Sequence, residues 1–376
     1  MIYFDNAATG GQKPEPVLTA VTAAVKLCAN PGRSGHKLSL ACARIVLDCR
    51  AALSDYFDGY GFERVAFTKN CTEALNLAIF GCLKPHDHVV TTCMEHNSVL
   101  RPLEKLKKAG VIDYDVCPLE NGNVSPETFF ALVRPNTKMA IVTAASNVTG
   151  AAPPLYELRA QLPESVLFCV DGAQGGGHIP LSLRKMGIDL LALAGHKGLH
   201  AIQGSGALLF SERVDPSPLL YGGTGSESFS LDMPNFFPDS LEAGTASFPA
   251  VSSLLAGVRY LAEHGEAARK KTAALTDYLH AEIEKIQDIR LYSKPNDCGI
   301  VSFSHRNLQS ELFAAELNEK YSVAVRGGLH CAPLMHAALG SEENGLVRAS
   351  LSEFNRAGEV EEFLSALHKI VGAWSD

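Results

Sequence analysis

Short apolar runs alternate with helical segments between about residues 62 and 210, and this alternation indicates an α/β fold. The runs lie at 65–67, 88–91, 139–143, 166–171, 190–194 and 206–210. Helical segments between successive runs are typical of strands that lie parallel to one another. We therefore predict a mainly parallel sheet flanked by helices.

A loop-rich stretch follows this α/β unit. Residues 214–248 contain many Gly, Pro and Ser residues, and a helix is predicted after them over 250–287. Further strands and a helix are predicted at 299–303, 323–325, 345–350 and 359–373. This mixture is typical of a smaller α+β domain.

The chain length predicts two domains. A chain of 376 residues with 46% hydrophobic content can bury more than one core. We expect a large α/β domain over 21–250 and a small α+β domain over 251–376, which residues 1–20 are expected to join.

The charge balance favours a protein that binds a small metabolite. The formal net charge is −8 and no block of Lys and Arg stands out, so we expect neither nucleic acid nor an anionic membrane as a partner. No run approaches the ~18 uncharged apolar residues of a membrane span. The first residues lack the basic and apolar regions of an export signal, so a cytoplasmic location is expected.

Cys331 differs from the other cysteines. The chain has ten cysteines without a CxxC pair, and most are expected to be buried free thiols of a reducing compartment. Examples in apolar patterns are Cys82, Cys169 and Cys298. Cys331 lies instead among turn residues, where a thiolate would be favoured by positive charge nearby. The candidates for that charge are His330, Arg326 and Arg348. No metal site is predicted.

Two polar turns after predicted strands indicate pyridoxal 5′-phosphate (PLP). Lys197 follows the run at 190–194, and Asp171 ends the run at 166–171. A lysine that holds this cofactor must lose its proton near neutral pH, and the pyridine nitrogen needs a carboxylate partner. Gln174, in the turn after Asp171, can reach the ring hydroxyl. Gly-His-Lys alone is more often a surface turn, so the pairing with Asp171 carries the prediction.

The segment Asn70-Cys-Thr-Glu-Ala-Leu-Asn76 is a candidate phosphate site. It follows a predicted strand and opens a helix, whose free N–H groups and dipole favour an anion. The hydroxyl of Thr72 would add a donor. The alternative is that Thr72 only caps the helix.

Taken with Asp5-Asn-Ala-Ala8, these residues resemble the fold-type I PLP enzymes of the class V aminotransferase superfamily. More narrowly, Val325-Arg-Gly-Gly-Leu-His-Cys-Ala-Pro333 and Val347-Arg-Ala-Ser-Leu351 resemble the group II (Suf-type) cysteine desulfurases, which include the selenocysteine lyases. The resemblance covers nearly the whole chain. It implies the fold-type I architecture, PLP as cofactor and a homodimer with a shared active site.

The resemblance also implies how the cofactor is held. Thr72 and His196 would contact the phosphate, with Cys71 in place of one hydroxyl residue of the family and Ala194 in place of a serine.

Two further residues would contact the cofactor ring. His96 would stack on the ring and belongs with Lys197 and Cys331 to the expected catalytic residues. Asn147 would touch the substrate carboxylate and the ring hydroxyl. Without the resemblance, His96 is an ordinary surface or core residue and Asn147 a turn former.

The C-terminal segments imply the substrate contacts. Arg348 would clamp the amino-acid carboxylate through its planar guanidinium. Arg326 would hold the cysteine loop or the substrate, unless it makes a structural ion pair. Cys331 would attack the substrate sulfur and become a persulfide. His330 is a candidate proton relay, and Leu329 occupies the position of a second histidine in the family.

Two loops resemble parts of the family that surround the active site. Leu241-Glu-Ala-Gly-Thr245 resembles a segment that reaches the partner's phosphate across a dimer interface, which makes Thr245 a cofactor contact. Asn30-Pro-Gly-Arg-Ser-Gly-His36 resembles a loop at the substrate entrance, which makes His36 a substrate contact. The alternative for the second loop is a simple Gly/Pro turn.

The leading hypothesis is a cysteine desulfurase that converts L-cysteine to L-alanine, uses Lys197 as proton shuttle and passes sulfur from Cys331 to an acceptor protein. One alternative is a selenocysteine lyase acting on L-selenocysteine, and another is an aminotransferase without thiol chemistry. A sulfur-relay scaffold without catalysis is disfavoured by the residues retained for chemistry, which are Lys197, Asp171, His96 and Arg348.

Overall fold

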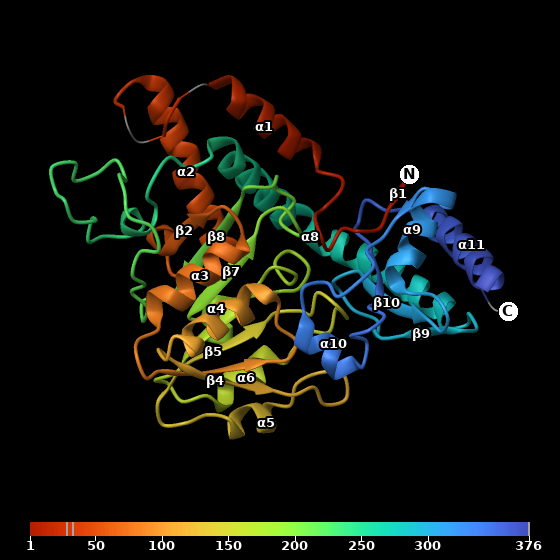
Figure 1. The fold of residues 1–376 in the computed structure, drawn as a ribbon. Coiled ribbons are helices and arrows are strands. Elements are labelled where there is room, and N and C mark those ends of the chain that lie inside the picture. Colours follow the sequence, from red (N-terminus) through yellow and green to blue (C-terminus); the bar gives the residue numbers. More distant parts are fainter. Residues whose placement is uncertain (28, 32–33, 375–376) are drawn as a thin grey trace.

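The computed structural model describes residues 1–27, 29–31 and 34–374. Figure 1 shows a large layered body and a smaller body, with one long helix running from the first into the second. The N- and C-termini both lie at the smaller body.

A seven-stranded sheet forms the centre of the large body, with the order β2-β8-β7-β6-β5-β3-β4. The strands are β2 (Val65–Thr68), β3 (His88–Thr92), β4 (Asp113–Cys117), β5 (Thr137–Thr143), β6 (Leu167–Asp171), β7 (Leu190–Ala194) and β8 (Gly206–Phe210). β3 to β7 pair in parallel, whereas β8 runs antiparallel to both β2 and β7. The prediction of a mainly parallel sheet is confirmed.

Alternate residues of the central strands enter two different cores. Val90 and Val142 belong to one hydrophobic cluster, and Val89 and Ile141 belong to the other. This follows from the two-residue period of a strand, and helices cover both clusters because a parallel sheet is buried on both faces. The sequence analysis missed β4, because this strand lies at the sheet edge and carries two aspartates.

Helices surround the sheet. They are α1 (Glu15–Leu27), α2 (Lys37–Tyr56), α3 (Cys71–Cys82), α4 (Asn97–Lys108), α5 (Pro126–Ala131), α6 (Leu155–Gln161) and α7 (Leu183–Met186), with the 3₁₀ turns η1 (Phe62–Arg64) and η2 (Asp239–Leu241).

Helix α8 (Phe248–Ile283) connects the two bodies. Its first part contributes Leu254 and Val258 to a core of the large body, and its second part contributes Leu279 and Ile283 to the core of the small body. The predicted helix over 250–287 therefore exists, but it begins two residues earlier and ends at Ile283.

The small body combines two small sheets with helices. β9 (Ile289–Leu291), β10 (Ile300–His305) and β12 (Val347–Ser350) form an antiparallel sheet, and β1 (Ile2–Tyr3) pairs in parallel with β11 (Val323–Ala324). The helices are α9 (Ser310–Tyr321), α10 (Pro333–Leu339) and α11 (Ala357–Trp374). The first strand thus returns to the C-terminal part, whereas α1 packs against α8 and not on the small core. The predicted domain boundaries remain a prediction.

Two details differ from the sequence-based expectations. Cys298 is buried as expected, but it lies in a turn before β10 and not inside a strand. The short strand β9 was also missed, because Ile-Arg-Leu is too brief to give a pattern.

Among the helices of the described residues, none is both long and apolar enough to span a membrane.

Candidate active site

A cavity of about 230 Å³ lies at the carboxyl ends of β5, β6 and β7, where residues of the small body also line it. This is the usual ligand position in an open α/β sheet. The predicted residues that line it are Cys71, Thr72, His96, Asn147, Asp171, Gln174, Ala194, His196, Lys197, Arg326, His330 and Arg348. Thr245, His36 and Cys331 do not line it.

Lys197 enters the cavity from a tight turn after β7. The Lys197 carbonyl accepts a hydrogen bond from the His200 N–H at 3.0 Å. Gly198 packs against Gly176, where a Cβ atom would collide with the carbonyl oxygen. Burial lowers the pKa of the Lys197 amine, Asp171 opposes this effect and Arg348 adds to it. The balance favours an amine that can give up its proton, as the PLP hypothesis requires.

Asp171 ends β6 and is 2% exposed. Its Oδ1 accepts hydrogen bonds from the Ala173 N–H at 2.9 Å and from the Cys71 thiol at 3.3 Å. Within the described residues both hydrogen bonds to this side chain go to Oδ1, so Oδ2 is available to a protonated ring nitrogen. Asp171 therefore fits the predicted role.

Cys71 lines the cavity, and its place in the phosphate site remains a prediction. The structure adds a contact that the sequence did not indicate, because the Cys71 thiol donates to Asp171. Burial and the Asp171 charge raise the pKa of Cys71, so the thiol stays protonated and can act as this donor.

The N-terminus of α3 lines the other end of the cavity. Asn70 caps the helix, because its Oδ1 accepts the Glu73 N–H at 2.9 Å. Thr72 is therefore not the helix cap, and its hydroxyl lies 2.7 Å from the Ser98 hydroxyl instead. Ser98 also lines the cavity and was missed by the sequence analysis. Its position in the first turn of α4, just after His96, was the available signal.

His96 and His196 lie on the cavity wall as neutral rings. His96 Nδ1 accepts the Ser98 N–H at 3.0 Å and caps α4, so the ring carries its proton on Nε2. Burial lowers the pKa of His96, although Asp171 opposes this. His196 Nδ1 lies 3.1 Å from the Thr9 hydroxyl, and burial lowers the pKa of His196 to about 4.

Gln174 lines the cavity, but its amide is already used. Its Nε2 donates to the Ala7 carbonyl at 2.9 Å, which ties the N-terminal segment to the turn after β6. The side-chain oxygen remains the group that can meet a ring hydroxyl.

Arg348 is the largest fully buried side chain and reaches the cavity from β12. Its guanidinium donates to the Asn147 carbonyl at 2.8 Å and to Asp5 Oδ1 at 3.1 Å. Its Nε has no hydrogen-bond partner in the described part of the chain. The sequence motif around Asp5 did not indicate this contact, and the ion pair of Asp5 with Arg348 holds the guanidinium in place.

Asn147 is not merely a turn former. The Ser146 hydroxyl accepts the Val148 and Thr149 N–H groups and so forms the turn. The Asn147 amide instead donates to the His330 carbonyl at 2.6 Å. This bond connects the turn after β5 to the cysteine loop.

The Cys331 thiol is exposed at the edge of this site. Arg326 Nη2 lies 3.7 Å from Cys331 Sγ, and the Cys331 carbonyl accepts the Asn97 N–H at 2.8 Å. In the described residues Arg326 makes no ion pair with a carboxylate. The structure therefore does not support the alternative that Arg326 has only a structural role in an ion pair. Both His330 and Cys331 have positive φ, at 48° and 58°. Two adjacent residues in this conformation are strained, and the bonds from Asn147 and Asn97 hold them there.

His330 cannot supply positive charge to the thiol, contrary to one expectation. It is buried, and its Nε2 lies 3.1 Å from the Leu346 carbonyl. Because a carbonyl only accepts, this nitrogen carries the ring proton. Burial, together with Arg348, lowers the pKa of His330 to about 2, so the ring is neutral. Arg326 and Arg348 are the remaining cations.

The two loops expected around the site lie apart from the cavity in the single chain. Thr245 is exposed, and the neighbouring Glu242 is anchored by Arg50 at 2.6 Å. His36 is exposed and caps α2 by accepting the Ser39 N–H at 3.2 Å. Gly32 and Arg33 of the same loop lie outside the described residues.

Comparison with known proteins agrees with this geometry. The sequence profile of the Aminotransferase class-V family matches residues 2–363. A probable cysteine desulfurase of Methanothermobacter thermautotrophicus is 33% identical over 99% of this chain and 95% of that protein.

Two solved structures show the same fold. The apo cysteine desulfurase of Thermococcus onnurineus NA1 has a TM-score of 0.92 and 32% identity, with 99% of this chain and 95% of that chain covered. The cysteine desulfurase CsdA of Escherichia coli has a TM-score of 0.90 and 25% identity, with the same coverage. The fold is therefore the fold-type I architecture that the sequence predicted.

Enzymes of this family depend on PLP, and the lysine, the buried aspartate and the helix N-terminus around the cavity suit that cofactor. The chain belongs to the aminotransferase class-V family.

Proposed function

We propose that the chain is a PLP-dependent cysteine desulfurase that converts L-cysteine to L-alanine and retains the sulfur as a persulfide on Cys331. The observation that carries the proposal is the exposed Cys331 thiol, 3.7 Å from the Arg326 guanidinium at the edge of the cavity that contains Lys197. An aminotransferase has no use for such a thiol.

The cavity residues suit PLP in position and in chemistry. Asp171 Oδ2 would hold a protonated ring nitrogen, and the flat neutral ring of His96 would stack on the cofactor. The free N–H groups at the start of α3, the Thr72 and Ser98 hydroxyls and His196 would bind the phosphate. Ser98 supports this assignment, because it supplies a hydroxyl in a site where this chain has Ala194 and the family resemblance implies a serine. When bound, PLP would accept the electron pair that forms at the substrate Cα.

Lys197 would attach the cofactor and move the proton. Its pKa is lowered by burial, so its amine can take the proton from the substrate Cα at neutral pH. The same amine can later return a proton to the product.

Arg348 would orient the substrate. Its Nε is buried without a partner in the described part of the chain, and a carboxylate would satisfy it. Asp5 and the Asn147 carbonyl hold the other two nitrogens, so the guanidinium is fixed before the substrate arrives. Such preorganisation reduces the entropy cost of binding.

Cys331 would take the sulfur. Its thiolate attacks the substrate sulfur, an S–S bond forms and the substrate Cβ–S bond breaks. The electron pair of the broken bond remains with the carbon, which gains a proton. The net change is L-cysteine plus the Cys331 thiol giving L-alanine plus the Cys331 persulfide, so atoms and electrons balance without an oxidant.

The assembly and the acceptor belong to the same proposal. We infer a homodimer in which Thr245 completes the partner's phosphate site, since Thr245 is exposed and does not line the cavity of its own chain. The exposure of Cys331 would give an acceptor protein access to the persulfide. A cytoplasmic location would match a thiol that must stay reduced.

Product analysis tests the function. Purified protein loaded with PLP is incubated with L-cysteine, without any keto acid, and alanine and the persulfide on the peptide containing Cys331 are measured. Equal amounts of alanine and bound sulfur in the first turnover are expected. Alanine that forms only with a keto acid would instead identify an aminotransferase. A parallel assay with L-selenocysteine distinguishes a selenocysteine lyase, which would release alanine from that substrate alone.

A further inference from the structure

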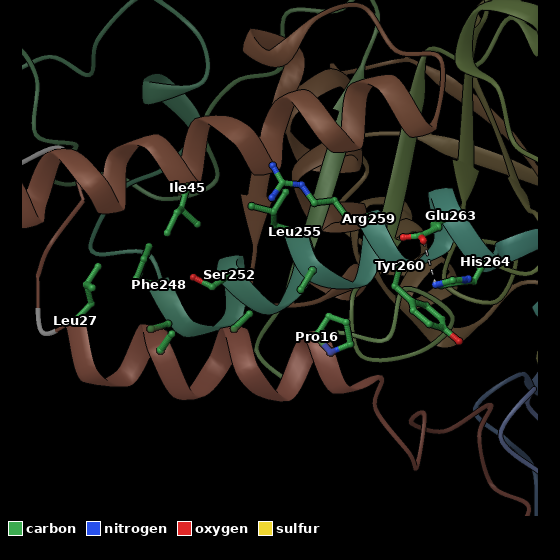
Figure 2. Close-up of a pocket in the computed structure, with 14 residues that line it drawn as sticks. Pro16, Leu27, Ile45, Phe248, Ser252, Leu255, Arg259, Tyr260, Glu263 and His264 are labelled. Atoms are coloured by element: carbon green, nitrogen blue, oxygen red, sulfur yellow. Dashed lines mark ion pairs between the residues drawn. The ribbon is translucent and has the colours of Figure 1, made fainter.

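A second cavity, of about 410 Å³, lies between α1, α2 and α8 (Figure 2). It shares no lining residue with the Lys197 cavity. Its walls are almost entirely hydrocarbon and include Ala20, Ala24, Ile45, Phe248 and Leu255. We call it the α1–α8 cavity.

Small side chains account for this space. Helix α1 faces α8 through Ala20, Ala23 and Ala24, and α8 contributes Ala256. Alanines at these positions bring the helices together without filling the volume between them. A cavity of this size lies within the range of small-molecule sites, and apolar cavities take up apolar molecules.

Ser252 places one polar group in this apolar wall (Figure 2). Its side chain is 5% exposed, and its hydroxyl has no hydrogen-bond partner among residues 1–27, 29–31 and 34–374. The next residue, Ser253, shows the normal situation, since its hydroxyl donates to the Ala250 carbonyl and accepts the Ile202 N–H. A buried hydroxyl without a partner is unfavourable, so Ser252 points to a ligand group that would pair with it.

The rim does not select a charged ligand. Arg259 Nη2 lies 3.7 Å from Asp48 Oδ2, and His264 Nε2 lies 3.7 Å from Glu263 Oε1, as the dashed line in Figure 2 marks. Arg259 therefore has a carboxylate neighbour, and Glu263 has an imidazole neighbour. Apart from these groups and Tyr260 at one end, the lining is apolar with the single buried hydroxyl of Ser252.

We propose that the α1–α8 cavity binds a neutral apolar small molecule that carries one hydrogen-bonding group, which pairs with Ser252. A second copy of the chain is the alternative occupant of this surface, and the test below includes it as an outcome. The proposal is independent of the desulfurase activity.

A dye of the proposed class tests the site in the full-length protein. N-phenyl-1-naphthylamine is neutral, largely apolar and carries one N–H group, and its fluorescence rises in apolar surroundings. We expect saturable binding of one dye per chain. Replacing Ala256 by Phe should fill the cavity and weaken binding at least about tenfold, because overlap with the ligand excludes it. Ala262→Phe, an exposed position of the same helix outside the cavity, should leave binding unchanged.

Ser252→Ala keeps the volume and removes only the hydroxyl. We expect the affinity for N-phenyl-1-naphthylamine to fall about threefold to tenfold, the value of one hydrogen bond. The affinity for 1-phenylnaphthalene, which lacks the N–H group, should stay unchanged. The melting temperature should not fall, because the hydroxyl has no partner to lose. This variant therefore keeps the test valid if Ala256→Phe fails to fold.

Four outcomes overturn the proposal. Binding without saturation, or equal affinity in the parent and both cavity variants, places the dye elsewhere. An equal loss for both dyes in Ser252→Ala removes the hydroxyl from the ligand contact. A change in oligomeric state in Ala256→Phe, with dye binding intact, assigns the surface to a second copy of the chain.

Discussion

Arg326 Nη2 lies 3.7 Å from Cys331 Sγ, and both residues belong to the loop that joins β11 to α10. The guanidinium contacts the exposed thiol directly, whereas the adjacent His330 is buried and neutral. The same loop thus contains both the thiol and the positive charge beside it. At Lys197, in the same cavity that Arg326 lines, burial and not a contact with a charged group is the main cause of the lowered pKa.

Arg326→Gln should slow alkylation of Cys331 by iodoacetamide at pH 7. The expected decrease is roughly threefold to fivefold, because a partly exposed charge contributes about 1 kcal/mol at most. The rate is measured by mass spectrometry of the peptide containing Cys331. Arg306→Gln is the matched control, since Arg306 is also a surface arginine of the small body and pairs with Asp288. An equal decrease in both variants would show that the general charge of this body, and not the contact, controls the thiol.

Lys197→Ala should remove the visible absorbance of lysine-linked cofactor and lower alanine formation by roughly 10³-fold, because no amine remains to move the Cα proton. Absorption spectra and single-turnover alanine assays measure the two effects. Lys185→Ala is a control on the surface of the same body. Undiminished alanine release by pure Lys197→Ala protein contradicts the assignment.

Much of the site was predictable because each strand-end residue was marked by the apolar run before it. Asp171 ends a buried strand, Lys197 and Asn147 follow buried strands, and parallel strands bring their carboxyl ends to one edge. Those residues do line one cavity. Arg348 was predictable only from its resemblance to a family motif, since nothing in local pattern separates it from a surface arginine.

Other parts depend on contacts between distant segments, which a local pattern does not contain. The bond from Cys71 to Asp171 joins residues on α3 and β6, and the Asp5–Arg348 pair joins the two ends of the chain. His330 is neutral because the small body buries it. The Gly and Pro residues around it are typical of an exposed turn, so the local sequence did not predict this burial. β4 was missed because an edge strand needs no continuous apolar run.

Asp171→Asn should retain some cofactor but slow removal of the Cα proton about tenfold to hundredfold, since a hydrogen bond to a charged group is replaced by a neutral one. Exchange of the substrate Cα proton with deuterated solvent measures this step directly. The Cys71 thiol can still donate to the new amide oxygen, so folding should be preserved. A normal exchange rate would show that another group protonates the ring nitrogen.

Glu95→Gln should make stability less dependent on pH. Glu95 is fully buried below the site, and burial raises the pKa of its carboxyl to about 8. In the unfolded chain the carboxyl has its ordinary pKa of 4.5, so the folded state binds an extra proton between these values and loses stability as pH rises through this window. The loss is about 1.4 kcal/mol per pH unit.

The glutamine oxygen can keep the bonds from Thr92 and Thr143 and has no charge to bury. We therefore expect the unfolding free energy of the variant to rise relative to that of the parent between pH 5 and pH 8. The expected change over this range is a few kcal/mol, from the dependence on pH given above. Urea unfolding at several pH values measures the difference. Parallel curves for the two proteins would mean that Glu95 is ionised in the fold.

Cys331→Ser should separate cofactor binding from sulfur transfer. A serine hydroxyl cannot become a persulfide, and it ionises far less readily than a thiol, so alanine formation from L-cysteine should fall by several orders of magnitude. The cofactor absorbance should stay normal, because Cys331 does not line the Lys197 cavity. L-selenocysteine should remain a substrate to a larger degree, since a selenol ionises readily and its carbon–selenium bond is weaker.

The selenium-to-sulfur activity ratio should therefore rise far above that of the parent, and it is measured as alanine release from each amino acid. Cys298→Ser is the matched control, because Cys298 is a buried thiol that lines neither cavity described above. Full cysteine activity in Cys331→Ser, or an unmodified Cys331 peptide in the parent protein during turnover, would reject the persulfide mechanism. A ratio that stays constant while both activities fall would instead mean that the thiol attacks selenium and sulfur alike.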